Sequence, residues 1–363
     1  MKKILLSILG LSLILYSCVD SPKERVNSPA IVINVDMEQK SIKQIKELFN
    51  EVRFIKLETN KESIFSEVGK LIIHGDGIYV LDKKTMKNIY VFNMNGNFLY
   101  KVLAKGEGPG ELMEPVDFNI KNDQIYVLDR LLKKIAVYDL TGAFVDEKKV
   151  EARLLNFELL NDGNILALSE INGGDNENEK LTLLSLGEGE QLKNFSVAQN
   201  TRDGNLKLDN VFSLYNDGIL YWQIFDNTVY TFQNGDVFER YKIDFGEYTI
   251  GPNILKLPLD VRLVKLNTNK KRYAGLLDNV IEDNVNLYFS FLHNGKTYNA
   301  LFNKNTKELN TFLLVDNEKN IEIKKIFTKT DNFYVSVVYP MDLDKGNNLL
   351  QEIDNPMLIL CRL

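Results

Sequence analysis

The sequence contains very few cysteine and histidine residues. Two of each are present among 363 residues, which excludes a framework of several disulfides. A zinc site of the lyase type needs several histidines. Only His74 and His293 are present, and the fold expected from the repeats places them on opposite faces. A zinc site of this type is therefore disfavoured. Neither a Gly-x-Ser-x-Gly elbow nor a paired Cys/His arrangement for nucleophilic catalysis is present.

An excess of basic residues is also lacking. The chain carries 44 Lys and Arg against 50 Asp and Glu, for a net charge of −6. No positive field is available to attract nucleic acid, and that class of partner is excluded. The composition, with 44% apolar and 26% charged residues, is that of a soluble globular protein. The apolar runs are short and rich in Ile, Val, Tyr and Phe, which favours strands.

One longer apolar run stands at the N-terminus. The stretch "MKKILLSILGLSLILYSC" (1–18) combines two lysines with a run too short for a comfortable spanning helix, which predicts a signal peptide over 1–17. Its ending, Leu15-Tyr16-Ser17-Cys18, resembles a bacterial lipobox, in which the cysteine is acylated. An ordinary secretory signal with a chance cysteine is the alternative. A lipid on Cys18 would hold an exported protein on a membrane, and we expect the outer membrane or cell surface rather than the inner membrane.

Residues 18–30 are polar, contain proline and are interpreted as a tether. Once Cys18 is acylated, Cys361 is the only other cysteine, so no intrachain disulfide can form and stability must come from the core. Cys361 lies in the apolar stretch "PMLILCRL" (356–363) and is expected to be a buried small hydrophobe.

Two segments of the chain are nearly the same. "IYVLDKKTMKNIYVFNMNGNF" (78–98) and "IYVLDRLLKKIAVYDLTGAF" (125–144) each follow a first strand and tight turn, and each contains a Gly-bearing hairpin turn. Four antiparallel strands in roughly 45 residues make one blade of a β-propeller, and repetition at this period is its sequence signature.

Weaker copies continue to the C-terminus and predict an all-β, six-bladed propeller of four-stranded antiparallel blades over residues 31–363. The last unit lacks a fourth strand, and the orphan strand 52–58 precedes the first blade, so we expect that N-terminal strand to close the ring. A short helix is expected at 41–49. The predicted blades are approximately 68–103, 116–150, 155–196, 209–245, 276–315 and 322–363.

The connector "AKGEGPGELMEPVDF" (104–118) resembles the Gly-rich connector of NHL-type repeats. With the orphan strand and the lipobox, it makes the chain similar to the six-bladed β-propeller lipoproteins of Bacteroidetes. This resemblance implies an exported, lipid-anchored propeller, often without an assigned activity. The glycines of the connector are interpreted as conformational and not as a phosphate cradle, because no Lys-Ser/Thr and no strand–loop–helix context follows them.

Propeller topology places the B–C loops and the D–A connectors on one face, which usually carries binding. The candidate ligand-binding residues of this loop face are Asp82, Lys84, Lys105, Glu107, Glu111, Asp129, Arg130, Phe225, Asn227 and His293. For Asp82 and Asp129 a structural role, bonding the backbone of their own loops, is preferred. Trp222 is expected in the core. Basic residues of 246–275, among them Arg262, form either a positive lip for an anionic ligand or a solvated loop.

The alternative function is a metal-dependent hydrolase. Six-bladed lactonases and esterases hold one metal in the central channel with Asp, Glu and Asn from inner strands, and oxygen ligands at one height suit Ca²⁺. Aligned inner strands place Asp117, Asn119 and Glu158 as the candidate ligands, all from neighbouring blades. These do not reach across the channel, so no catalysis and no cofactor are expected.

We therefore expect a monomeric, lipid-anchored propeller that binds a ligand or partner through its loop face. The expected ligand is a glycan, a peptide or another envelope protein, and a purely structural role in an envelope complex is the third hypothesis. The fold by itself does not decide between them.

Overall fold

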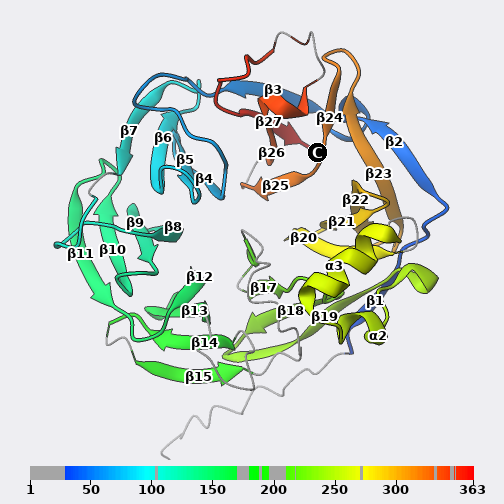
Figure 1. Cartoon of the computed structure of the whole chain (residues 1–363), viewed down its shortest axis with the longest axis horizontal. Coiled ribbons are helices and arrows are strands. Elements are labelled where there is room, and N and C mark those ends of the chain that lie inside the picture. The colour runs from blue at the N-terminus through cyan, green and yellow to red at the C-terminus, as the bar shows by residue number, and fades with distance from the viewer. Residues whose placement is uncertain are drawn as a thin grey trace, which may run out of the picture.

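The computed structural model describes residues 29–102, 105–169, 180–187, 190–195, 210–216, 218–269, 273–330, 333–343, 347 and 349–363. The predicted signal peptide, the predicted lipidation site Cys18 and nearly all of the predicted tether lie outside these residues. The described strands form six sheets around a central channel, and each sheet contains a blade of four antiparallel strands (Figure 1). The predicted six-bladed β-propeller is confirmed.

The first three blades follow the chain without interruption. Blade one contains β4 (Lys70–His74), β5 (Gly77–Asp82), β6 (Asn88–Asn93) and β7 (Phe98–Val102). Blade two contains β8 (Pro115–Lys121), β9 (Gln124–Asp129), β10 (Lys134–Asp139) and β11 (Phe144–Lys149). Blade three contains β12 (Leu154–Leu159), β13 (Asn164–Ser169), β14 (Lys180–Ser185) and β15 (Gln191–Phe195).

The last three blades have the same order from the inner to the outer strand. Blade four contains β16 (Phe212–Tyr215), β17 (Gly218–Trp222), β18 (Thr228–Gln233) and β19 (Asp236–Asp244). Blade five contains β20 (Ala274–Glu282), β21 (Asn286–His293), β22 (Lys296–Asn303) and β23 (Leu309–Asp316), with β24 (Ile321–Ile323) added to β23. Blade six contains β25 (Ile326–Lys329), β26 (Tyr334–Val338), β27 (Met357–Arg362) and, as its outer strand, β3 (Glu51–Lys56).

Ring closure occurs as the sequence predicts. Strand β3 pairs antiparallel with β27, with Val52 opposite Cys361. The N-terminal strand thus completes the blade that the C-terminus leaves unfinished, and it pairs the edge of β27 that would otherwise be open. Every described strand lies between Ile31 and Arg362, so the ring is complete without residues 1–28.

The residues before β3 form a belt on the outer wall of the ring, which the sequence did not indicate. Strand β1 (Ile31–Asn34) adds in parallel to β19 of blade four, and β2 (Lys40–Gln44) adds in parallel to β23 of blade five. In Figure 1 this blue segment runs outside blades four and five towards β3. The helix predicted for 41–49 is therefore mostly wrong. Strand β2 occupies its first half, and only the single turn α1 (Ile45–Leu48) is helical.

The core consists of six apolar clusters, each between two neighbouring blades. In β5, Ile78 and Val80 pack towards blade six, whereas Tyr79 and Leu81 pack towards blade two. Because successive side chains of a strand point to opposite faces, both faces of each blade are buried against neighbours. The apolar runs are therefore continuous, as the sequence shows in "IYVL".

The long connector between blades four and five is helical. It contains the 3₁₀ turn η1 (Gly246–Tyr248), the short helix α2 (Pro252–Leu255) and helix α3 (Leu259–Thr268). Pro252 stands at the first turn of α2, where its missing N–H costs no hydrogen bond. The loop between β26 and β27 likewise contains a 3₁₀ turn, η2 (Pro340–Asp342). No helix among the described residues has the length and hydropathy to span a membrane.

Candidate functional site

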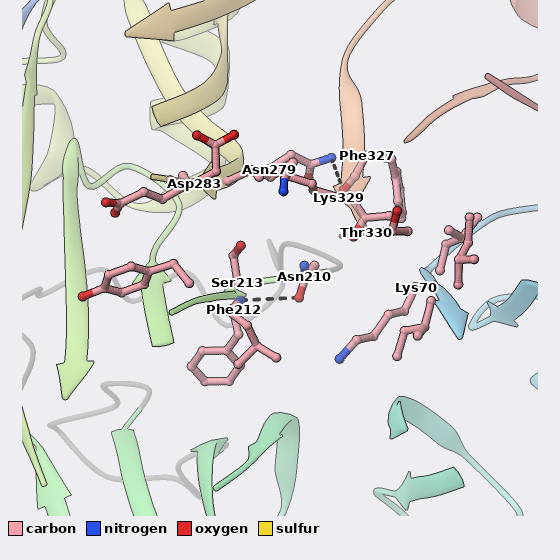
Figure 2. Close-up of a pocket in the computed structure, with 18 of the residues that line it drawn as sticks. Lys70, Asn210, Phe212, Ser213, Asn279, Asp283, Phe327, Lys329 and Thr330 are labelled. Atoms are coloured by element: carbon pink, nitrogen blue, oxygen red, sulfur yellow. Dashed lines mark hydrogen bonds between the residues drawn. The ribbon is translucent and has the colours of Figure 1, made fainter. Parts of the chain in front are cut away.

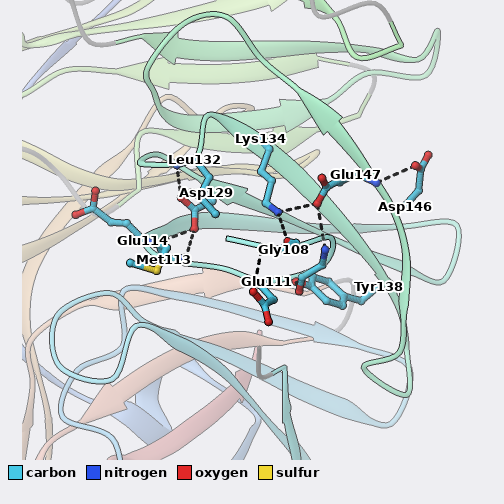
Figure 3. Close-up of polar contacts among 11 residues, drawn as sticks. Gly108, Glu111, Met113, Glu114, Asp129, Leu132, Lys134, Tyr138, Asp146 and Glu147 are labelled. Atoms are coloured by element: carbon cyan, nitrogen blue, oxygen red, sulfur yellow. Dashed lines mark hydrogen bonds and ion pairs between the residues drawn. The ribbon is translucent and has the colours of Figure 1, made fainter. Parts of the chain in front are cut away.

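The strand-end aspartates predicted on the loop face serve as backbone acceptors. Asp82 accepts hydrogen bonds from the N–H groups of Lys84, Thr85 and Met86 in its own loop. Asp129 accepts from the N–H groups of Leu132, Met113 and Glu114, which ties its loop to the preceding connector (Figure 3). Both carboxylates are fully buried. The structural interpretation of the repeated "IYVLD" ending is confirmed.

The Gly-rich connector before blade two is fastened by polar contacts (Figure 3). Glu111 accepts a hydrogen bond from Gly108 N at 2.8 Å. The ammonium of the buried Lys134 reaches Gly108 O at 3.0 Å and Glu147 Oε2 at 2.6 Å, and that carboxylate also accepts from Gly110 N. Gly110 has φ +69°, which favours glycine. Lys134 and Glu147 were not singled out from the sequence, because long-range pairing between strand and connector leaves no local pattern.

The other loop-face candidates of blades one and two differ in exposure. Arg130 makes a two-bonded ion pair with Glu114, at 3.1 and 2.9 Å. Lys84 lies 2.5 Å from Glu67 and is 69% exposed. Lys105 and Glu107 are also exposed.

The candidates of blades four and five are mostly buried. Phe225 is 4% exposed, with the guanidinium of Arg262 4.8 Å above its ring. His293 is 6% exposed and lies 3.1 Å from Tyr273 O, and burial lowers its pKa. Asn227 is half-buried. Arg262 itself is buried and donates to the carbonyls of Leu255 and Leu257, so neither alternative, the positive lip or the solvated loop, describes this residue.

A hollow lies elsewhere, in the central channel. A cavity of about 800 Å³ is lined by residues of the inner strands and by A–B turn residues such as Gly75, Asn216, Asp283 and Asn284. Because the turns line it, the cavity opens on the A–B turn face, opposite to the loop face. None of the ten predicted loop-face residues lines it.

At the deep end of this cavity, blades one to three bring together one cation and three oxygen-bearing side chains. Lys70 Nζ lies 3.0 Å from Asp117 Oδ1, 3.2 Å from Asn119 Oδ1 and 3.4 Å from Glu158 Oε1. All four side chains are buried. The three residues named for the metal alternative thus lie together, but around the cation of Lys70, which the sequence analysis had not assigned to this place.

Burial and charge act in opposite directions within this cluster. Burial disfavours the ammonium of Lys70, but the carboxylates of Asp117 and Glu158 outweigh that effect and raise its pKa. Burial raises the pKa of Glu158, and the attraction of Lys70 offsets this only in part. Lys70 is therefore a protonated partner of the carboxylates and not an amine nucleophile.

These donors do not fit a calcium ion. The ammonium of Lys70 already occupies the space that the ion would need, and Ca²⁺ requires six to eight oxygen ligands. Asp117 is further committed, because it accepts from the N–H groups of Phe118 and Phe157. Within the described part of the chain, no group of three or more His, Cys, Asp or Glu side chains could hold a metal. Calcium binding, the alternative of the sequence analysis, therefore stays a prediction that these contacts do not support.

Blades four, five and six supply the remaining wall of the cavity (Figure 2). Asn279 donates from Nδ2 to the carbonyls of Ile326 and Phe327. Asp283 accepts from the hydroxyl of Tyr334 at 2.5 Å. The other labelled wall residues are Asn210, Phe212, Ser213, Phe327, Lys329 and Thr330.

Two buried groups of this wall bear on what the cavity can hold. Glu282 makes two bonds of 2.7 Å to Arg240 and one of 2.7 Å to Lys304, so its charge is neutralised by the protein. Trp222 is fully buried, as predicted, and also lines the cavity; its Nε1 has no hydrogen-bond partner within the described structure. That donor is closed off from solvent, so the part of Trp222 that borders the cavity is its apolar ring.

Comparison with known proteins assigns a family. A family model described as "Domain of unknown function (DUF4934)" matches residues 29–362. The chain belongs to the DUF4934 family. No curated protein matches this DUF4934 chain.

Two solved structures share the fold of the DUF4934 chain. One is a Bacteroides fragilis protein named "putative exported protein", with 18% identity, a TM-score of 0.72, and coverage of 92% of this chain and 99% of its own. The other is a DUF4221 family member from Bacteroides vulgatus, with 11% identity, a TM-score of 0.57, and coverage of 86% and 96%. At these identities the likeness concerns the fold alone.

Proposed function

We propose that this DUF4934 protein is an exported binding module of the cell envelope that captures a neutral, hydroxyl-rich ligand, such as a saccharide, in its central cavity. The observation that carries the proposal is the cavity of about 800 Å³, whose lining includes amide and hydroxyl side chains such as Asn210, Ser213 and Thr328. Ligand pockets of proteins have volumes of roughly 300–1,000 Å³ and few, well-placed polar groups.

The charges around the cavity favour a neutral ligand. Four cations, Lys70, Arg240, Lys304 and Lys329, face four carboxylates, Asp117, Glu158, Glu282 and Asp283, and most are paired with each other. A charged ligand would have to disrupt these pairs. The remaining lining contains amides, hydroxyls and aromatic rings, among them Asn210, Ser213, Thr328, Phe327 and Phe333. Amides and hydroxyls pair with sugar hydroxyls, and aromatic rings stack against the apolar faces of sugars.

Location is part of the same proposal. The lysine-led apolar run and Cys18 support export and acylation. The name of the Bacteroides fragilis neighbour and the resemblance to Bacteroidetes propeller lipoproteins agree with this. We propose a monomer held on the outer membrane or cell surface, where envelope glycans are available, with no catalytic step and no cofactor.

Trp222 provides the test, because it is the only tryptophan of the chain and lies in the cavity wall. Titration of residues 19–363 with neutral oligosaccharides, acidic oligosaccharides and short peptides should give a saturable change in tryptophan fluorescence with the neutral oligosaccharides. Ser213→Phe, which places a ring inside the cavity, should abolish that change. The matched control, Ser41→Phe on the exposed outer belt, should retain it.

A ligand that binds equally well to the Ser213→Phe protein would show that binding occurs outside the cavity. Preference for the acidic oligosaccharides or peptides would refute the neutral ligand class. Mass analysis of Cys18 in protein isolated from membranes tests acylation separately.

A further inference from the structure

The inner strand β20 of blade five has an irregular backbone where it borders the cavity. Its pairing with β21 shifts register twice, between Gly275 and Asp278 and again between Asp278 and Ile281. Leu276 and Asn279 have φ +55° and +49°, and among the described residues other than glycine only these two have a positive φ inside a strand. Bulged and strained backbone of this kind is concentrated at functional sites, and Asn279 lies in the cavity wall.

The side-chain amide of Asn279 uses its nitrogen and leaves its oxygen open. The residue is 4% exposed, and Nδ2 donates to the carbonyls of Ile326 and Phe327 in β25 at 3.0 and 3.1 Å. Two carbonyl acceptors fix which end of the amide is the nitrogen. Within the described part of the chain, Oδ1 accepts no hydrogen bond and is not among the atoms closed off from solvent. Because Asn279 lines the cavity (Figure 2), Oδ1 is an acceptor available to a ligand there.

Another inner strand contains the same arrangement with its acceptor already filled. Asn119 of β8 donates from Nδ2 to Phe157 O, in the inner strand of the next blade, at 2.6 Å. Its Oδ1 accepts from Lys70 Nζ at 3.2 Å. Buried acceptors in folded proteins are normally paired. The ring thus satisfies Asn119 with a cation of its own, whereas Asn279 is left for a donor that the described residues do not supply.

Two hydroxyls on the neighbouring inner strands are also available. Ser213 belongs to β16 and Thr328 to β25, the strands on either side of β20, and both side chains line the cavity. In the part of the chain that the structure describes, neither hydroxyl takes part in a hydrogen bond, and neither is closed off from solvent. Phe327 adds an aromatic ring to the same wall. The open polar groups therefore gather on blades four to six.

We propose that Asn279 Oδ1 accepts a hydrogen bond from a hydroxyl of the bound saccharide. The hydroxyls of Ser213 and Thr328 bond its neighbouring hydroxyls, and Phe327 stacks against an apolar face of the sugar ring. This inference rests on the proposed saccharide binding and adds which wall of the cavity selects the ligand. A site built to bond a hydroxyl rejects the analogue that lacks it, because the buried acceptor is then left unpaired.

The test is titration calorimetry on residues 19–363, which contain every described strand. The probes are neutral disaccharides of glucose, mannose and galactose and, for those that bind, their monodeoxy analogues. In the unaltered protein at least one analogue should bind about tenfold more weakly than its parent sugar, as expected for one lost hydrogen bond. Asn279→Gly, which accommodates the positive φ, should bind the parent about tenfold more weakly and no longer distinguish it from that analogue.

Asn279 also joins β20 to β25, so variants without that structural role accompany it. Ser213→Ala and Thr328→Val each remove only a hydroxyl, and each should weaken binding of the parent sugar about threefold or more with unchanged unfolding. The matched control is Asn299→Ala. Asn299 is buried, donates to Lys324 O and is not one of the lining residues. Its loss should lower stability but leave the affinities for parent and analogues as in the unaltered protein.

Equal discrimination among the deoxy analogues by Asn279→Gly and by the unaltered protein would overturn the proposal. Equal weakening of binding in Asn299→Ala would do the same, because the loss would then follow from stability alone. If Asn279→Gly does not fold, full affinity in both Ser213→Ala and Thr328→Val overturns it. In each of these cases loss of binding in Ser213→Phe leaves the cavity function standing, whereas absence of saccharide binding by the unaltered protein refutes that function and this inference together.

Discussion

At the scale of single residues, the inner end of the channel is dominated by buried charges that are paired with each other. Lys70 is held by Asp117 and Glu158 in a nearly buried site at the end of the cavity, and Asn119 accepts a further hydrogen bond from it. Taking such charges out of water is costly, and only their mutual pairing makes the arrangement stable. The cluster connects the inner strands of three consecutive blades. It therefore stabilises the ring as well as shaping the cavity.

Lys70→Met should destabilise the protein by about 3–5 kcal/mol near neutral pH, because it leaves two buried carboxylates without a cation. The folded-state pKa of Glu158 is already raised, so its contribution to stability is full below its unfolded pKa and is lost as pH rises through the folded pKa. Removal of the Lys70 ammonium should raise the folded-state pKa of Glu158 further, so more stability is lost as the pH rises. Urea unfolding should therefore show a larger deficit at about pH 8 than at about pH 5.

Lys84→Met is the matched control for that substitution, because Lys84 is 69% exposed and should change the free energy of unfolding by less than about 0.5 kcal/mol. If the loss in free energy of unfolding caused by Lys70→Met does not vary with pH, the carboxylates of Asp117 and Glu158 are not left charged in that variant.

Glycine at position 110 is required for two separable reasons. Its φ is +69°, and a Cβ there would lie 2.5 Å from the ring of Phe144. Gly163 has φ +83° but open space around it. Gly163→Ala should cost about 1–2 kcal/mol from backbone strain alone, and Gly110→Ala should cost about 1–3 kcal/mol more because the ring must move. Thermal unfolding of the two variants measures the difference, and equal losses would refute the steric contribution.

At the scale of elements, the belt shows how an N-terminal segment can stabilise a ring beyond closing it. Strands β1 and β2 cover the outer edges of blades four and five before β3 completes blade six. Ile33 of β1 packs into the cluster between blades four and five, as do Val35 and Met37 that follow it. An otherwise exposed sheet edge is thereby paired in two blades.

Ile33→Ala should destabilise the protein by about 2–5 kcal/mol, because Ile33 is 1% exposed and its removal leaves a cavity in that cluster. Val32→Ala, on the opposite side of the same strand and 56% exposed, should have an effect below about 0.5 kcal/mol. Urea unfolding checks both. Equal small effects would show that the belt adds little to the stability of the ring.

At the scale of the whole molecule, the ring has its joint between β27 and β3. Cys361 of β27 lies opposite Val52 of β3 and is fully buried. Burial raises the pKa of its thiol to about 12, so the reactive thiolate is scarce as long as the joint is closed. The thiol therefore reports opening of the ring.

In residues 19–363, which contain no other cysteine, Cys361 should resist a thiol reagent under native conditions and react at the rate of opening. Ile55→Ala, which weakens the closing strand in the cluster between blades six and one, should accelerate labelling more than Val32→Ala does. Rapid labelling of the unaltered protein would contradict a tightly closed joint.

Much of the architecture could be predicted because its signals are local. Hairpin turns such as Asn95-Gly96 and the alternation in Ile78–Leu81 depend on residues close in the chain, and copies of one unit predict a ring. The column of inner-strand residues even placed Asp117, Asn119 and Glu158 together. The belt was missed because β1 and β2 pair in parallel with strands that are far away in the chain. Helix α3 was missed although Leu259, Leu263 and Leu266 follow helical spacing.

The sequence by itself determined the strands, the blade repeat and the closing strand, since each follows from side-chain alternation and turn chemistry. Only the tertiary structure decided which charges meet and which face is hollow. Lys70, Glu158 and Trp222 are distant in the chain, and their burial around one cavity depends on closure of the ring. The physical reason is that pairing and desolvation of charge depend on position in space, which local sequence does not encode.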